Sequence, residues 1–117
     1  MTRQREAGSQ ILLDALLARQ RPAPTGVARS EADAALAVAD GKADVAFGLS
    51  CLARQFRLDF VPVTRERYDL VVDRRAWFEP PLQRLAAFCR SPDLARKALE
   101  LGGYDLSGLL TVRYNAP

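Results

Sequence analysis

The side chains that most enzymes use for acid–base chemistry are scarce in this sequence. Histidine is absent from all 117 residues, which removes the usual base of serine and cysteine hydrolases and the commonest metal ligand. The two cysteines, Cys51 and Cys89, each lie in an apolar helical pattern and have no metal-ligand spacing, so we interpret them as buried thiols. The sequence therefore predicts no catalytic residues, no metal site and no cofactor, and a protein that is not an enzyme.

Three short segments with a serine remain as candidates for chemistry, because each is predicted to begin a helix. A helix N-terminus has unsatisfied N–H donors and the positive end of the helix dipole, so it binds anions without a cationic side chain. Serine is also the favoured N-cap residue, so capping alone explains each serine, and only their convergence would indicate a ligand site. The segments are Gly8-Ser9-Gln10, Ser30-Glu31 and Gly48-Leu49-Ser50.

Helical patterns account for much of the chain. Residues 9–20 follow an i, i+4 apolar pattern after Ser9, and residues 50–56 form a further short helix. Ser30 opens the best-marked helix, because Asp33 three residues later completes a capping-box pattern. An alanine-rich run continues to Ala39, and Asp40-Gly41 ends the helix. Helical patterns return at residue 80 and again after Ser91, where a proline occupies the first helical position.

Short apolar runs between these helices predict strands. The runs cover residues 26–28, 43–48, 58–63 and 68–73, with a weaker candidate at residues 110–114. Strands that alternate with helices, without internal repeats, indicate a mixed, largely parallel sheet covered by helices. We expect a single α/β domain over residues 1–117.

Charge and hydropathy indicate neither nucleic acid nor membrane as a partner. The 17 basic residues are interspersed with 14 acidic ones, and no helix-turn-helix pair with a basic recognition helix is present. The first nine residues are polar, unlike a signal peptide, and no apolar run is long enough to cross a bilayer. We expect a cytoplasmic protein.

The order of segments in the second half resembles a known fold. It runs G-K-A-D-V-A-F-G (residues 41–48), D-F-V-P-V (59–63), Y-D-L-V-V (68–72) and L-A-A-F-C-R-S-P (85–92), and ends in G-G-Y-D (102–105). This order is similar to the type 2 periplasmic-binding-protein fold of molybdate-binding proteins and LysR-type effector domains. The resemblance is greatest to the cytoplasmic branch attached to helix-turn-helix regulators or to molybdopterin-biosynthesis proteins. It implies a three-layer α/β/α C-terminal lobe whose N-terminal lobe is missing.

The resemblance also implies a ligand site, because members of the family bind ligand in the cleft between two lobes. Helix N-termini would line one wall of that cleft, and Arg3 or Arg5 would add charge. Many relatives carry a histidine where Glu31 falls, and an acidic side chain there would repel an oxyanion such as molybdate. The implied ligand-binding residues are Arg3, Gly8, Ser9, Gln10, Ser30, Glu31, Gly48, Ser50 and Tyr68.

Two functional hypotheses follow. The first is a sensor module that binds a small anion or metabolite and belongs to a transcriptional regulator or a molybdenum-cofactor-related protein. The alternative is a truncated half-domain that binds no ligand alone and acts as a homodimer or through a partner chain, since a lone lobe exposes the surface that its missing lobe covers.

Overall fold

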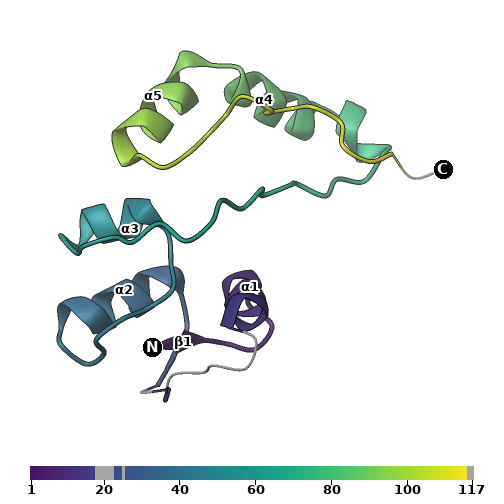
Figure 1. The fold of residues 1–117 in the computed structure, drawn as a ribbon. Helices are drawn as coiled ribbons and strands as arrows, with labels where there is room; N and C mark the ends of the chain where they lie inside the picture. The colour runs from purple at the N-terminus through teal and green to yellow at the C-terminus, as the bar shows by residue number, and fades with distance from the viewer. Residues whose placement is uncertain (18–22, 25, 116–117) are drawn as a thin grey trace. The chain divides into compact units, whose positions relative to one another are not determined.

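The chain divides into two compact units, Met1–Pro62 and Val63–Pro117. The computed structural model describes residues 1–17, 23–24 and 26–115, and Figure 1 shows the elements along the chain. Each unit is described by itself below.

The first unit is built on a short parallel β-α-β arrangement. Strand β1 (Thr2–Arg3) leads into helix α1 (Gly8–Leu17), and strand β2 (Val27–Ala28) pairs parallel to β1 with Thr2 opposite Val27. Helices α2 (Glu31–Ala39) and α3 (Ser50–Gln55) follow, and α2 packs against β1, β2 and α3. The predicted strand at residues 26–28 is thus confirmed, whereas β1 was not predicted because two residues show no periodicity.

Helix α2 has the boundaries that the sequence predicts. Ser30 is its N-cap, and the Ser30 hydroxyl oxygen accepts a hydrogen bond from the Asp33 N–H at 3.0 Å. After the C-cap, Gly41 adopts φ 72°, and the Lys42 N–H donates to the Ala37 carbonyl at 2.8 Å. Both ends of α2 are therefore stabilised locally.

The starts of α1 and α3 differ from the prediction that a serine caps each. Helix α1 begins at Gly8, so Ser9 lies inside the first turn, and the predicted end near residue 20 lies outside the described residues. Helix α3 has Leu49 as its N-cap without a side-chain hydrogen bond, and Ser50 is its first helical residue. Neither serine is an N-cap, because α1 begins two residues and α3 one residue earlier than a serine cap requires.

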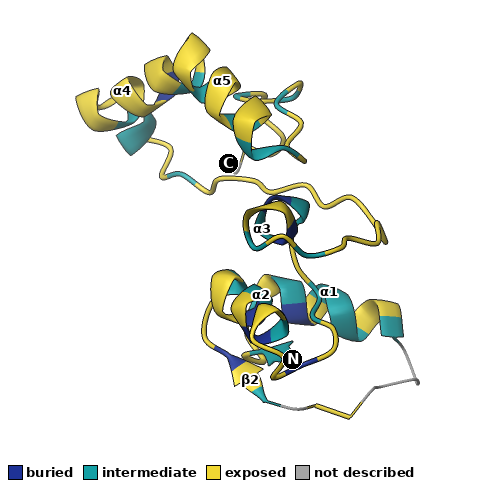
Figure 2. Cartoon of the chain, turned by 90° about the vertical axis from the view of Figure 1, so that its left-hand side faces the viewer, coloured by how far each residue is buried: buried dark blue, intermediate teal, exposed yellow. Residues whose placement is uncertain are grey.

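Small side chains make up the core of the first unit. The apolar residues buried there are Ala28, Ala34, Ala37, Ala43, Cys51 and Ala53. Figure 2 shows buried positions along the side of α2 and on α3. Because alanine and cysteine are small, α2 can lie close to β2 and α3, and little room is left for large side chains between them.

The larger mixed sheet and the three-layer arrangement are not present in the described residues, where the sheet has two strands. Residues 43–48, 58–63, 68–73 and 110–114 form no strand, contrary to the prediction. Apolar β-branched runs favour strands only where a neighbouring strand supplies hydrogen bonds and packing. These runs lack such a neighbour here, and Val71 is fully exposed.

The second unit is helical. A short 3-10 helix η1 (Ala76–Phe78) precedes α4 (Pro80–Cys89) and α5 (Pro92–Leu101), and α4 packs against η1 and α5. Prolines at the helix starts and Gly102 after α5 agree with the prediction. Ser91 is the N-cap residue of α5, but its hydroxyl donates to the Phe88 carbonyl at 2.6 Å and forms no capping hydrogen bond with α5.

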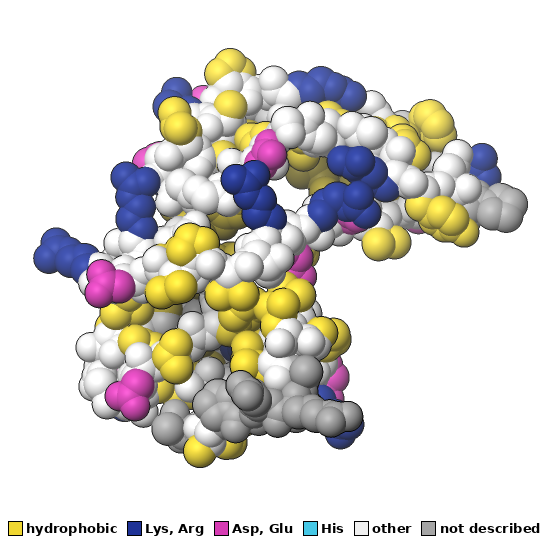
Figure 3. Space-filling model, viewed as in Figure 1, with side chains coloured by type: hydrophobic (Ala, Val, Ile, Leu, Met, Phe, Trp, Pro, Cys, Tyr) yellow, Lys and Arg dark blue, Asp and Glu magenta, His cyan; other side chains and the backbone are white. Residues whose placement is uncertain are grey.

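Hydrophobic side chains reach the surface in both units. Figure 3 shows them in yellow on the drawn face, among arginine and lysine side chains. In the described part of the second unit, Ala86 is the buried apolar residue. The first unit therefore holds most of the core.

Candidate functional site

Polar side chains from β1, α1 and α2 meet in the first unit. The Ser9 hydroxyl donates a hydrogen bond to Glu31 Oε1 at 2.6 Å, and Arg3 Nη1 lies 3.3 Å from the same oxygen. The Arg3 backbone N–H donates to Gln10 Oε1 at 2.9 Å. We call Arg3, Ser9, Gln10 and Glu31 the Glu31 cluster.

The secondary structure explains why these side chains meet. Arg3 ends β1, Ser9 and Gln10 lie in the first turn of α1, and Glu31 is the first residue of α2. In a parallel β-α-β arrangement the carboxyl end of a strand lies beside the N-termini of the helices that follow. A carboxylate in the first helical turn is also favoured by the helix dipole.

The Arg3–Glu31 ion pair is largely shielded from water. The Arg3 side chain is 13% exposed and the Glu31 side chain 31%. Arg3 Nε, Arg3 Nη1 and Glu31 Oε2 are buried, and no described residue forms a hydrogen bond with them. A buried polar atom without a hydrogen bond is costly and rare in proteins, so these atoms mark a place where further hydrogen bonds can form.

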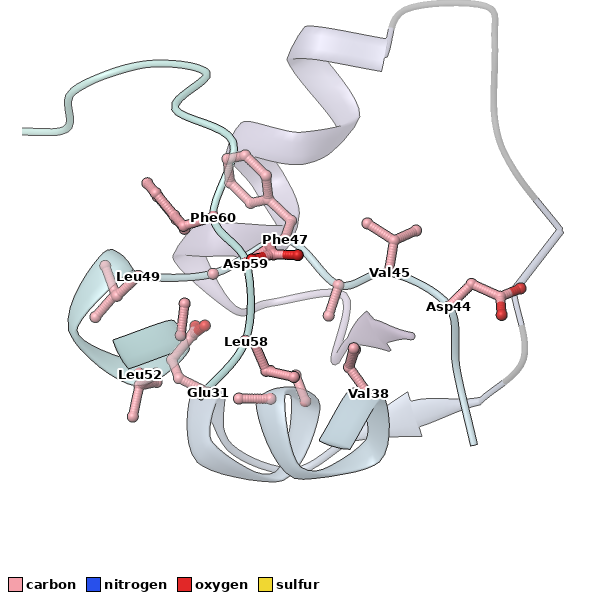
Figure 4. A pocket seen from close by; sticks show the side chains of 15 residues that line it. Glu31, Val38, Asp44, Val45, Phe47, Leu49, Leu52, Leu58, Asp59 and Phe60 are labelled. Atoms are coloured by element: carbon pink, nitrogen blue, oxygen red, sulfur yellow. The ribbon is translucent and has the colours of Figure 1, made fainter. Parts of the chain in front are cut away.

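A pocket of about 110 Å³ adjoins Glu31 in the first unit. Residues from α2, α3, the segment 44–49 and the segment 58–60 line it, as Figure 4 shows. Its acidic lining residues are Glu31, Asp44 and Asp59, and neither lysine nor arginine is among the described residues that line it. Most of the remaining lining is apolar, with Val38, Leu52 and Leu58 among its side chains.

Gly48 lies on the side of this pocket that Glu31 Oε2 faces. A Cβ atom added at Gly48 would be 3.9 Å from Oε2, and no closer neighbour would meet it. A Cβ atom at this position would therefore make an ordinary contact with the Glu31 carboxylate. Gly48 thus lines the pocket and lies next to Glu31 of the cluster.

The structure brings together five of the nine residues that the resemblance implies. They are the four residues of the Glu31 cluster and Gly48. Gly8 is exposed at the start of α1, Ser30 serves as a helix cap, and Ser50 lies outside the pocket lining. Tyr68 lies in the second unit with 88% of its surface exposed, so the structure does not place it in the site.

Sequence reasoning missed two lining residues that matter for charge. Asp44 and Asp59 were each assigned to a predicted strand, and their acidic character was not used. The available signal was that an acidic residue is the second residue of each of these two apolar runs. That signal is weak, because acidic residues at element ends are ordinary surface features.

Other kinds of site find no support in the described ranges. No group of three or more cysteine, aspartate and glutamate side chains there could hold a metal ion. Cys51 is buried in α3 and Cys89 is partly buried in α4, close to the prediction that both are buried. Among the same residues, no helix is sufficiently long and apolar to cross a membrane.

Comparison with known proteins adds one family and one relative. The chain is 37% identical over 71 residues to an uncharacterized protein in the 5′ region of the ferredoxin 2Fe-2S gene of Clostridium pasteurianum. The match covers 60% of this chain and 63% of the relative, so it spans less than two thirds of that protein. No solved structure matches. Residues 1–90, which include the Glu31 cluster and the pocket, match the family described as the PBP superfamily domain. The chain therefore belongs to this family.

Proposed function

We propose that this chain is a non-enzymatic module that binds a small ligand beside the Glu31 cluster. Membership of the PBP superfamily supports a binding role. The proposal depends on one observation. Arg3, Ser9 and Glu31, which come from three elements, contact one another beside a pocket that Glu31 itself lines. The absence of histidine from the sequence supports binding over catalysis.

The proposal extends to a sensor role, in which another domain or chain carries the output. A regulator of transcription and a protein of molybdenum-cofactor synthesis are the two settings that the sequence resemblance implies. Molybdate and related oxyanions are accordingly the first ligands to test, although Glu31 already neutralises Arg3 in the cluster. The proposal that a small ligand binds beside the Glu31 cluster depends on neither of these two settings.

Thermal melts of the full chain test the binding proposal. A ligand that binds only the folded state raises the melting temperature, by an amount that increases with its concentration. We expect at least one member of a panel of oxyanions, small carboxylates and organic cations to do so. A melting temperature unchanged across the whole panel would contradict the proposal.

Association with another chain is a second candidate, and the exposed strand-like segments favour it. Val61 is 78% exposed, and it lies in an extended segment without strand pairing. Unpaired extended backbone with apolar side chains is a template for pairing with another chain. Light scattering over a range of concentrations tests this candidate, since a monomer at all concentrations would contradict self-association.

A further inference from the structure

The two carboxylate oxygens of Glu31 have different surroundings. Oε1 accepts a hydrogen bond from the Ser9 hydroxyl and lies 3.3 Å from Arg3 Nη1. Oε2 is buried, accepts no hydrogen bond from any described residue, and would lie 3.9 Å from a Cβ atom added at Gly48. Arg3 is not among the residues that line the pocket. The cation of the cluster thus pairs with Glu31 without lining the pocket.

All charged residues among the described residues that line the pocket are acidic. Glu31, Asp44 and Asp59 contribute carboxylates, and Figure 4 shows Asp44 pointing away from the other two labelled acidic side chains. The carboxylates of Glu31 and Asp59 would repel an anion in the pocket and attract a cation. A partly buried site screens such interactions less than bulk water does.

The rest of the lining suits an apolar body of limited size. Val38, Leu52 and Leu58 come from α2, α3 and the segment 58–60. The volume of about 110 Å³ is below the roughly 300 Å³ at which pockets for drug-sized molecules begin. The pocket thus has room for a small head group and a short chain, but not for a large metabolite.

We infer that this pocket takes a small organic cation, an ammonium group on a short alkyl chain. The carboxylates of Glu31 and Asp59 attract the ammonium group, and the alkyl chain lies against the apolar lining. The inference rests on the proposed binding function and names the ligand class for the same site. It differs from the oxyanion that the sequence resemblance implies, because Glu31 lines the pocket and Arg3 does not.

Isothermal titration calorimetry with three probes of one shape tests the inference. The probes are n-butylammonium, n-butanol and n-butyrate, each titrated into the full chain at constant ionic strength. We expect saturable binding of n-butylammonium, with n-butanol and n-butyrate at least about tenfold weaker, because a hydrogen bond between charged groups contributes more than a neutral one. Equal binding of all three, or preferred binding of n-butyrate, would overturn the inference.

Two variants locate the binding at Glu31. Glu31→Gln keeps the shape of the side chain and removes its charge, and we expect n-butylammonium to bind at least about tenfold more weakly. Asp33→Asn removes one negative charge from the same helical turn, outside this pocket lining, and should bind as the unchanged chain does. If both variants lose affinity to the same extent, the binding depends only on net charge and the inference is wrong.

A third variant keeps the ion pair intact in case Glu31→Gln fails to fold. Gly48→Ala places a methyl group 3.9 Å from Glu31 Oε2 in ordinary contact, so the fold should be retained. Because Gly48 lines the pocket, that methyl group narrows it, and n-butylammonium binding should fall by about tenfold or more. Unchanged affinity in a folded Gly48→Ala would contradict the assigned position.

Molybdate and sulfate distinguish failure of the inference from failure of the proposed function. If either oxyanion binds saturably and n-butylammonium does not, the inference is overturned and the binding function stands. If neither oxyanion nor any organic probe binds, both are overturned. Saturable binding of n-butylammonium that Gly48→Ala weakens supports both.

Discussion

Two serines predicted as helix caps play different roles at the residue scale. Ser30 accepts a hydrogen bond from the Asp33 N–H, while Ser50 is the first helical residue of α3 and does not cap it. We predict that Ser30→Ala lowers the free energy of unfolding by about 1 kcal/mol, as loss of an N-cap does. Ser50→Ala should change it by less than about 0.5 kcal/mol. Urea denaturation of both variants checks this, and equal losses would contradict the assigned caps.

The Arg3–Glu31 pair should matter more than ion pairs on the surface. Replacing Arg3 with methionine leaves the mostly shielded Glu31 carboxylate without its cation, and we predict a loss of about 1–3 kcal/mol of stability. The exposed pair Arg96–Asp93 is the control, and Arg96→Met should cost less than about 0.5 kcal/mol. Denaturant unfolding at low and high salt measures both, and a small loss for Arg3→Met would show that the pair does not hold β1 to α2.

Five residues of the candidate site were named from the sequence, through predicted helix starts and the family resemblance. Arg3, Ser9, Gln10, Glu31 and Gly48 were named and do come together, because a β-α-β connection places strand ends beside helix starts. The direct partnership of Ser9 with Glu31 was not foreseen, since the distance between side chains 22 positions apart depends on packing. Charge in the pocket was missed for the same reason.

At the scale of elements, two helices end in the same hydrogen-bonding motif with different residues. After α2, Gly41 has φ 72°, and after α3, Arg57 has φ 57°. In each case the N–H of the next residue donates back to the helix, from Lys42 to Ala37 and from Leu58 to Ala53, both at 2.8 Å. A left-handed conformation costs a residue with a Cβ atom about 1–2 kcal/mol, whereas glycine adopts it freely.

Substitutions at these two positions should have opposite effects on the free energy of unfolding. Arg57→Gly is predicted to raise the free energy of unfolding by about 0.5–1 kcal/mol. Glycine removes the cost of the left-handed conformation, and the greater entropy of the unfolded chain cancels part of that gain. Gly41→Ala should lower it by about 1 kcal/mol, although no atom lies within 4 Å of the added Cβ. Chemical denaturation decides, and a loss of stability in Arg57→Gly would contradict the motif at α3.

Helices were predicted better than strands because their signals are local. Ser30, Gly41 and the prolines that begin α4 and α5 act within one helical turn, so a single sequence reveals them. A strand depends on a partner far along the chain, and Val45 and Val71 lie in apolar runs that have none among the described residues. Strand propensity therefore predicted extended backbone but not a sheet.

At the scale of the whole molecule, protection from hydrogen exchange should follow the uneven distribution of the core. The amides of α2 lie beside buried alanines, whereas no backbone amide of residues 59–72 donates a hydrogen bond to a described residue. We predict slow exchange in α2 and nearly unprotected exchange in residues 59–72. Exchange measured by mass spectrometry at two protein concentrations checks this. Protection of residues 59–72 at low concentration would contradict the fold, and protection only at high concentration would indicate pairing between chains.

The central claim is that a small ligand binds beside Glu31 in the first unit. The most direct test is a titration of the ¹⁵N-labelled full chain with n-butylammonium, followed by amide chemical shifts. The account predicts saturable shifts that are largest at Glu31, Gly48 and Asp59, with little change in α4 and α5. Shifts that do not saturate, or that are largest in α4 and α5, would contradict it.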